Sequence, residues 1–247
     1  MTEAKNPLGY TAIYDDKAHT YKVKETNTYL TGVTAFISNF IPEFNAEYWA
    51  KKKASDLGTT EEKIKKKWEN KAQKARDIGH LVHLYAHCKL NKKKSIPNPT
   101  CQRSEQLFKR IDESISYLSN FFFFVCSEMI VFSPSLGLAG TIDLVMQHKK
   151  SKNYILLDWK QNAKITSSNT WQQCLPPIKH LDSCDTVKYG LQLSFYKKIL
   201  DHEQYFPGAK ISQLGLIHLV EDCQAINIPI KYMGSEIERI LKKKNDL

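Results

Sequence analysis

The order of secondary structure in this sequence predicts an α/β protein, or a closely related α+β one, with a mixed central sheet flanked by helices. Helical periodicity dominates the first half of the chain, whereas strand-like apolar runs follow one another in the second half, with helices between them. The chain has 247 residues, 42% of them hydrophobic, which is enough for one well-packed domain. We therefore expect a single domain over residues 1–247.

The chain opens with β structure. Residues 10–14 and 20–24 alternate around a polar turn, a pattern that predicts a hairpin. A short helix is expected over residues 33–39, and it ends before Pro42 because proline cannot continue a helix.

Two longer helices follow. Thr59 and Glu62 have the spacing of a capping box and would open a helix that runs toward Leu90. Pro97 and Pro99 then break the chain. The next helix is expected to be amphipathic, because apolar residues recur at helical spacing: Leu107, Ile111, Ile115 and Leu118.

The second half of the chain mixes strands and helices. Residues 121–131 form a largely apolar run that is typical of a buried strand. Two more strands are expected on either side of a lysine-rich turn at residues 149–152. A helix, a pair of strands and a final helix complete the chain. These elements are expected at residues 141–148, 153–160, 186–202, 213–220, 225–231 and 235–244.

The charge of the chain favours a polyanionic partner. The formal net charge is +10 and the isoelectric point is about 9.2, an excess that attracts nucleic acid. A lysine-rich surface without any nucleic-acid partner would explain the charge about equally well. The lysines are scattered through the chain, as expected if folding collects them in one groove, with clusters at 51–53, 65–67, 92–94, 149–152 and 242–244.

Several other protein classes are disfavoured. The longest apolar run, at residues 121–126, is too short to cross a bilayer. The N-terminus lacks the apolar core of a signal peptide, so we expect an intracellular protein that is not secreted. The six cysteines include no C-x-x-C pair, which argues against a zinc ribbon and a disulfide framework.

The hairpin at residues 141–160 brings two acidic residues together. If residues 149–152 form the turn, His148 pairs with Asn153, and the same register sets Asp143 opposite Asp158. Directly opposed side chains are about 5 Å apart at Cβ, and opposed like charges are destabilising unless something compensates them. Mg²⁺ prefers oxygen ligands and would compensate two carboxylates.

Lys160 adds a cation to this pair. Asp158 and Lys160 are two residues apart and therefore share one face of the strand, whereas Ile155, Leu157 and Trp159 share the other. An ammonium there could orient an attacking water or balance charge on a phosphate. An isolated match of this kind is more often a surface salt-bridge cluster. Here, however, Asp158 follows a strongly apolar run, which such a cluster explains less easily.

These residues resemble the RecB-like branch of the PD-(D/E)XK nucleases. The segments GLAGTIDLV and YILLDWK are similar to the G-x-x-D and D-x-K motifs of that family, and YGLQLSFYKKIL is similar to its Q-x-x-x-Y helix. IGHLVHLYAH resembles the G-x-x-x-H motif. The resemblance covers most of the chain. The segment LPPIKHLDSCDTVKYGLQLSFY is similar to exonuclease-like members in phage and viral replication modules and to the mitochondrial genome maintenance exonuclease. The motifs are individually loose but specific in their combination and order.

The resemblance implies a role for each motif residue. Asp143 and Asp158 would bind Mg²⁺ or Mn²⁺ and Lys160 would assist catalysis, while Gln192 and Tyr196 would contact substrate. His83, Glu128 and the carbonyl of Trp159 would complete the metal site. His80 and His87 flank His83, but a site for zinc shared by all three is not expected because the outer two lie about 10 Å apart along a helix. Only Cys223 follows the Q-x-x-x-Y segment, so no iron–sulfur cluster is expected.

The resemblance also implies a fold and an activity. Residues 1–120 would form an N-terminal hairpin and helical part, and residues 121–247 a restriction-endonuclease-like core. The implied activity is exonuclease action on DNA ends, with single-stranded DNA favoured, in replication, recombination or repair, where proteins of those processes could be partners. A structure-specific endonuclease and an inactive DNA-binding module remain open as alternatives. No membrane association is expected.

Overall fold

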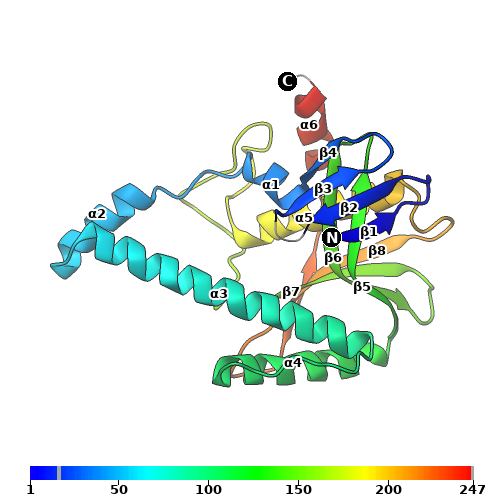
Figure 1. Ribbon diagram of the computed structural model, residues 1–247. Coiled ribbons are helices and arrows are strands. Elements are labelled where there is room, and N and C mark those ends of the chain that lie inside the picture. Colours follow the sequence, from blue (N-terminus) through cyan, green and yellow to red (C-terminus); the bar gives the residue numbers. More distant parts are fainter. Residues whose placement is uncertain (16–17, 246–247) are drawn as a thin grey trace.

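The centre of the molecule is a nine-stranded mixed sheet with helices on both faces (Figure 1). This computed structural model describes residues 1–15 and 18–245. The strand order is β1-β2-β3-β4-β6-β7-β8-β9, and β5 also pairs with β6. The expected α/β class with a mixed, helix-flanked sheet is confirmed.

The N-terminal strands form an antiparallel series that joins the main sheet. They are β1 (Thr2–Lys5), β2 (Thr11–Asp15), β3 (Thr20–Val23) and β4 (Tyr29–Gly32). The expected β2–β3 hairpin is confirmed, but β1 and β4 were not expected. β4 then pairs with β6 in the parallel direction, so the N-terminal strands belong to the same sheet as the rest of the chain.

The rest of the sheet follows the expected succession of strands. β5–β6, β6–β7 and β8–β9 are antiparallel pairs, and β7–β8 is parallel. The turn between β6 and β7 is the expected one, because His148 N–H donates to Asn153 O at 2.8 Å. The strands are β5 (Phe122–Ser133), β6 (Leu138–His148), β7 (Tyr154–Lys160), β8 (Ile211–His218) and β9 (Ile226–Ile230).

The sheet forks along β6. One side of β6 pairs with β5 along its whole length. The other side is shared: β4 pairs with Leu138 and Ala139, and β7 pairs with residues 144–147. Within the described part of the chain, residues 140–143 have no strand partner on that side. Asp143 therefore lies where the two neighbouring strands diverge.

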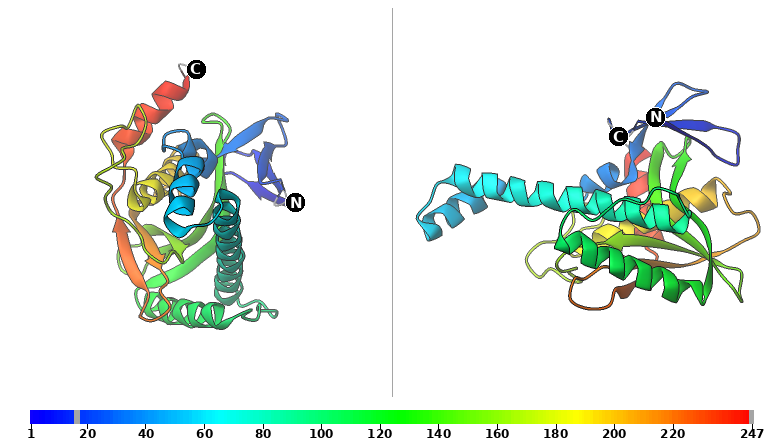
Figure 2. Two further views of the ribbon diagram at one scale, coloured as in Figure 1. Left: turned by 90° about the vertical axis from the view of Figure 1, so that its left-hand side faces the viewer. Right: turned by 60° about the horizontal axis from the view of Figure 1, so that its bottom comes forward.

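Helices cover the two faces of the sheet in separate groups. α3 (Glu61–Leu90) and α4 (Gln102–Ser119) pack on one face. The opposite face holds α1 (Val33–Ser38), α5 (Asp185–His202) and α6 (Gly234–Asn245). The N-terminal half of α3 extends beyond the sheet together with α2 (Ala46–Leu57), as the right-hand view of Figure 2 shows.

The helix boundaries correct the expectations in two places. The N-cap of α3 is Thr60 rather than Thr59, because the Thr60 side chain accepts the hydrogen bond from Lys63 N–H at 3.4 Å. A further helix, α2 (Ala46–Leu57), was not expected. The Asn45 side chain caps its first turn, accepting from Tyr48 N–H at 2.9 Å.

The β-strands separate two apolar clusters. On β7, Leu156 packs toward α5, whereas Ile155, Leu157 and Trp159 pack toward α3 and α4. This alternation confirms the expected faces of the strand. The start of β5 is less buried than expected, because the side chain of Phe123 is 50% exposed. Phe122 and Phe124 are only partly buried against the α3–α4 cluster, and of this run only Ser127 and Val131 are fully buried.

Among the residues described, no helix is both long enough and apolar enough to cross a membrane.

Candidate metal centre

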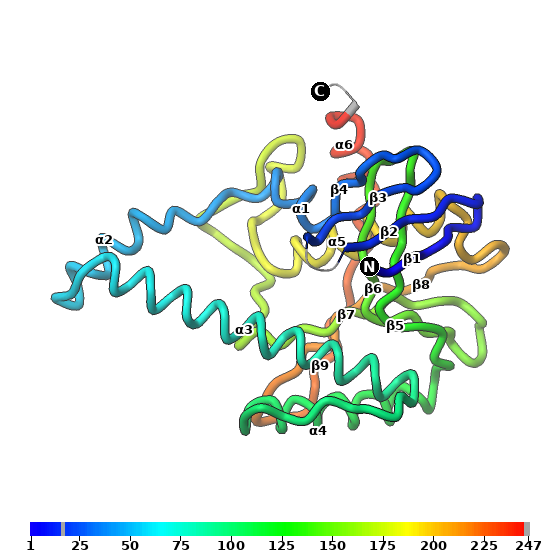
Figure 3. Tube along the Cα trace, viewed as in Figure 1, coloured from blue at the N-terminus to red at the C-terminus, as the bar shows by residue number. Residues whose placement is uncertain are grey.

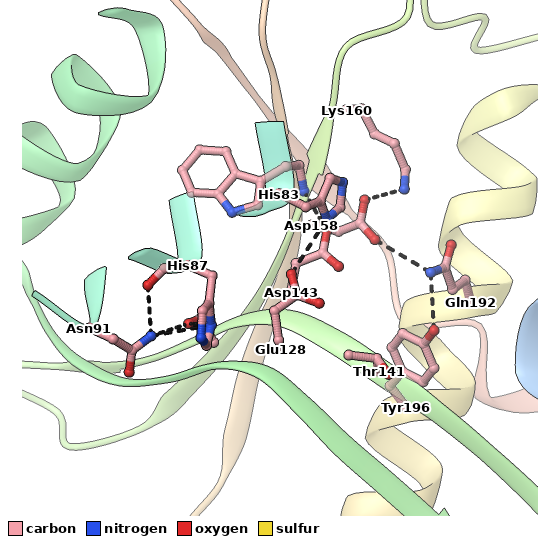
Figure 4. A network of polar contacts seen from close by, with 12 residues as sticks. His83, His87, Asn91, Glu128, Thr141, Asp143, Asp158, Lys160, Gln192 and Tyr196 are labelled. Carbon is pink, nitrogen blue, oxygen red and sulfur yellow. Dashed lines mark hydrogen bonds and ion pairs between the residues drawn. The ribbon is translucent and has the colours of Figure 1, made fainter. Parts of the chain in front are cut away.

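Three acidic residues lie side by side on three adjacent strands. The β5–β6 register on either side of Glu128 places this residue level with Asp143. The β6–β7 register, continued one residue past the last pair, Leu144 and Leu157, places Asp158 level with Asp143. Asp143 and Asp158 are buried, whereas Glu128 is partly exposed. The two carboxylates of the predicted hairpin thus have the expected register, and a third joins them from β5 (Figure 4).

His83 of α3 lies over this acidic row. Its Nδ1 is 3.5 Å from Glu128 Oε1 and 3.5 Å from Asp143 Oδ2. The three side chains offer ligand atoms that all lie within 4.8 Å of one another. One imidazole nitrogen and two carboxylates from three separate elements could therefore bind one divalent cation.

The backbone of Glu128 is unusual for a strand residue. Its φ is +53°, in the left-handed region that non-glycine residues rarely adopt. Such a conformation costs on the order of 1–3 kcal/mol and is found preferentially at functional sites. This backbone conformation occurs at the residue whose carboxylate lies beside His83.

Asp158 and Lys160 complete the site from β7. Asp158 Oδ2 is buried and forms an ion pair with Lys160 Nζ at 2.5 Å, and it accepts no other hydrogen bond from the described residues. Asp143 is better satisfied, since Trp159 N–H donates to its Oδ2 at 2.9 Å. A buried carboxylate oxygen with incomplete hydrogen bonding is where a cation would fit.

The two buried aspartates have opposite pKa shifts. Burial, followed by repulsion from Asp143, raises the pKa of Asp158 to about 6, although Lys160 partly opposes this. Burial would also raise the pKa of Asp143, but attraction by His83 and Lys160 together with the Trp159 N–H holds it below its usual value. At neutral pH both are carboxylates, and Asp158 is the one whose charge most needs a cation nearby.

The carboxylates raise the pKa values of the two cationic groups of the site, His83 and Lys160. Burial alone would lower the pKa of His83, but Asp143 and Glu128 raise it well above its usual value. Burial likewise opposes the charge of Lys160, and Asp158 followed by Asp143 outweighs it and raises its pKa. The imidazolium of His83 thus provides charge balance that a metal ion would otherwise supply.

Gln192 and Tyr196 of α5 face the site from the other side. Gln192 Nε2 is 3.4 Å from Asp158 Oδ1 and donates to Tyr196 Oη at 3.1 Å. The ring of Tyr196 lies against the backbone of Gly140, at a position where a Cβ would be 3.0 Å from its Oη. The glycine of the G-x-x-D segment is therefore needed to admit this tyrosine.

The remaining candidates have less direct positions. The Trp159 indole is buried on the opposite face of β7 from Asp158, and the role of its carbonyl as a ligand stays a prediction. His87 is not part of the site: its Nδ1 is 2.8 Å from Ser127 Oγ. His80 is exposed. Within the described residues, the only group of at least three clustered ligand side chains is the one containing His83.

One aromatic residue at the site was not predicted. The Lys160 ammonium lies 4.5 Å from the ring centroid of Tyr189, whose hydroxyl accepts from Asn162 Nδ2 at 2.9 Å. Tyr189, Gln192 and Tyr196 follow the i, i+3, i+7 spacing of one helix face. That spacing could have identified Tyr189 from the sequence.

The segment between β7 and α5 holds an aromatic residue and a histidine, Trp171 and His180. Trp171 is 95% exposed, so it does not cover the core. His180 Nε2 is 3.3 Å from Glu236 Oε1 of α6. Neither residue contacts the metal centre.

Comparisons with known proteins show limited similarity. No protein-family model matches the sequence, and no curated protein matches it significantly. One similar solved structure is a crystal structure of a candidate exonuclease from Eubacterium rectale, with 16% sequence identity and a TM-score of 0.46. The match covers 70% of this chain and 65% of that one, so the chain spans slightly under two thirds of the length of that protein.

Proposed function

We propose that the protein is a nuclease of the PD-(D/E)XK type, in its RecB-like branch, that hydrolyses DNA with the help of a divalent cation. The proposal depends on one observation: Asp143, Asp158 and Lys160 converge with Glu128 and His83 at the fork of the sheet. The sequence resemblance supports exonuclease action on DNA ends, preferentially single-stranded ones, in replication, recombination or repair.

The donor set suits Mg²⁺ or Mn²⁺. Asp143, Asp158 and Glu128 supply the hard oxygen ligands that these ions prefer, and His83 supplies one nitrogen. A divalent cation bound here would polarise a phosphate oxygen and lower the pKa of a nearby water. The features that fit a cation are the buried Asp158 oxygen, whose one partner among the described residues is the Lys160 ammonium, and the raised pKa of this carboxyl group.

The chain's own residues would orient the reacting groups. Lys160 is held between Asp158 and the ring of Tyr189, so its ammonium is fixed where it can stabilise charge on a phosphate or orient an attacking water. Gln192 and Tyr196 offer an amide and a hydroxyl on the α5 side, where they could position the substrate.

Lys160 gives the direct test. End-labelled single-stranded and double-stranded DNA would be incubated with the wild-type protein in Mg²⁺, in Mn²⁺ and in EDTA. We expect cleavage that requires the metal, and its loss in Lys160→Ala and in Lys160→Met, which keeps the length of the side chain. Lys150→Ala is the matched control, because it removes an exposed lysine from the turn of the same hairpin. Normal cleavage by both Lys160 variants would show that the assigned site is wrong.

A closed circular single strand separates the two enzymatic modes. An exonuclease leaves the circle intact, whereas an endonuclease converts it to a linear strand. A protein that binds DNA in a salt-sensitive manner but cuts none of these substrates would instead be a DNA-binding module.

A further inference from the structure

A strongly basic groove lies between the N-terminal half of α3 and the start of α4. Its volume is about 780 Å³. We call it the lysine groove, and it is defined by six basic side chains: Lys63, Lys66, Lys67, Lys71, Lys74 and Arg103. None of the described residues that line it is acidic or aromatic. Figure 3 shows the chain turning from α2 into the N-terminal end of α3, where this part of the helix begins.

The five lysines form one stripe along α3. Steps of three or four residues join Lys63, Lys67, Lys71 and Lys74 along one face of the helix, and Lys66 lies next to Lys67, three residues after Lys63. At 1.5 Å per residue the stripe is roughly 16 Å long. A charged row of this length can contact several successive phosphates rather than one isolated anion.

The positive charge of the groove is largely uncompensated. No carboxylate of the described residues lies within ion-pair distance of any of the five lysines. On a different side of the same helix, by contrast, Arg76 is paired with Glu69 at 2.7 Å. Arg103 is the partial exception within the groove, since its Nε is 2.9 Å from Glu221 Oε1.

Gln161, which directly follows Lys160, connects the groove to the metal centre by hydrogen bonds. Arg103 Nη2 donates to Gln161 O at 3.0 Å, and Gln161 Nε2 donates to Ala75 O at 2.9 Å. Ala75 and Arg103 line the groove, and Gln161 directly follows Lys160 in the chain. A strand that leaves the site past Gln161 would therefore enter the lysine groove.

We propose that the lysine groove binds the sugar–phosphate backbone of a nucleic-acid strand while the metal centre acts on a neighbouring phosphodiester, an inference that rests on the proposed function. The absence of aromatic side chains from the described lining indicates that the groove contacts phosphates and does not stack bases. Binding there is therefore sequence-independent and salt-dependent.

The test compares two variants that each lose four positive charges. The groove variant carries Lys66→Ala, Lys67→Ala, Lys71→Ala and Lys74→Ala; alanine favours the helix, so folding is retained. The control variant replaces exposed lysines on other elements: Lys93→Ala, Lys94→Ala, Lys150→Ala and Lys231→Ala. Binding of a fluorescent 20-nucleotide single strand is measured by anisotropy between 50 and 500 mM salt, in EDTA.

The expected result is a large and selective effect. Each phosphate contact contributes about 0.7 to the slope of log K against log salt for a single strand. Loss of four contacts should reduce the slope by up to about 2.8 and weaken binding at 0.1 M salt by up to about 600-fold. We expect at least a tenfold loss in the groove variant and less than a threefold loss in the control. Equal losses in both variants, or no loss in the groove variant, would overturn the proposal.

A cleavage assay separates the groove from the metal centre. The groove variant should cut a 40-nucleotide strand with reduced kcat/KM but should cut a dinucleotide, which is too short to reach the lysines, as the wild type does. An equal loss on both substrates would mean that the lysines act on the metal centre itself, contrary to the proposal. If the wild type cuts nothing, the proposed function fails, while the binding measurement in EDTA still decides whether the groove binds nucleic acid.

Discussion

Replacing Gly140 by alanine should destabilise the protein by pushing against Tyr196. A Cβ at this position would overlap Tyr196 Cε1 and would lie 3.0 Å from its Oη and 3.1 Å from its Cζ. The tyrosine is only 3% exposed, so it cannot swing into solvent. Overpacking of this kind costs about 1–3 kcal/mol. Alanine also lowers the conformational entropy of the unfolded chain, which stabilises the folded state by up to about 1 kcal/mol. We expect a net loss of roughly 1–2 kcal/mol, which for a chain of this size lowers Tm by about 2–8 °C.

Gly79→Ala is the matched control. Gly79 lies inside α3, and its Cβ would meet only the Gln161 amide nitrogen at 3.4 Å, an ordinary contact. Because alanine is a better helix former, this variant should gain up to about 1 kcal/mol. Thermal and urea unfolding of both variants measure the difference. In Gly140→Ala, DNA cleavage should also fall, because Tyr196 must move away from Gln192. An unchanged Tm and unchanged cleavage in Gly140→Ala would refute the packing argument.

Three further outcomes are expected. The raised pKa of His83 stabilises the metal-free protein fully below pH 6.5, and this stabilisation is lost as pH rises through the raised value. Binding of Mg²⁺ or Mn²⁺ at pH 7 should therefore release up to about one proton. Calorimetry in two buffers measures this release, which should be absent in His83→Gln. Trp171→Ala should leave the free energy of unfolding within about 0.5 kcal/mol, because the side chain is exposed; a larger loss would mean that the indole packs in solution. Asn6→Ala should cost about 1.5–3 kcal/mol in urea unfolding, since it removes the 2.7 Å hydrogen bond to the buried Glu203 carboxylate; a neutral effect would contradict that contact.

The hairpin that carries Asp143 and Asp158 was predictable because its geometry is local. A turn over residues 149–152 fixes the register, and the period of two fixes the faces, so the sequence determines which side chains meet. The structure has that register and those faces. The helices with strong apolar stripes, such as α4, were predictable for a similar reason.

Elements held by distant partners were not predictable in this way. β1 and β4 are four residues long, and their sequences TEAK and YLTG show no alternation of apolar and polar side chains. β4 is a strand because Thr31 and Gly32 pair with Leu138 and Ala139, more than a hundred residues along the chain. Such pairing is a tertiary effect that overrides local propensity.

The missed helix α2 is a different case, because its end signals are present in the sequence. Asn45 is a favoured N-cap, and Gly58 has φ +58° at the C-terminus. Its apolar stripe is weak, since only Ala50 and Ala54 are buried, against α3. The capping residues at its two ends therefore identify this helix better than its apolar periodicity does.

The position of Glu128 in the candidate site depended on a backbone detail. Its place before the glycine segment was expected from the sequence resemblance, but the positive φ that accompanies its approach to His83 has no counterpart in the residue pattern. Contacts between α3 and β5 likewise depend on how the helix crosses the sheet. Long-range packing therefore decides which acidic residues join the hairpin pair.

The fork along β6 has a consequence for local motion. Where β4 and β7 part, the backbone on that side of residues 140–143 gives up strand pairing, while β5 holds the other side throughout. Widening this gap breaks fewer backbone hydrogen bonds than separating strands elsewhere in the sheet, so small rearrangements around Asp143 cost little free energy. The backbone beside the acidic row is therefore paired on one side only, by β5, and is the part of β6 that can rearrange most easily.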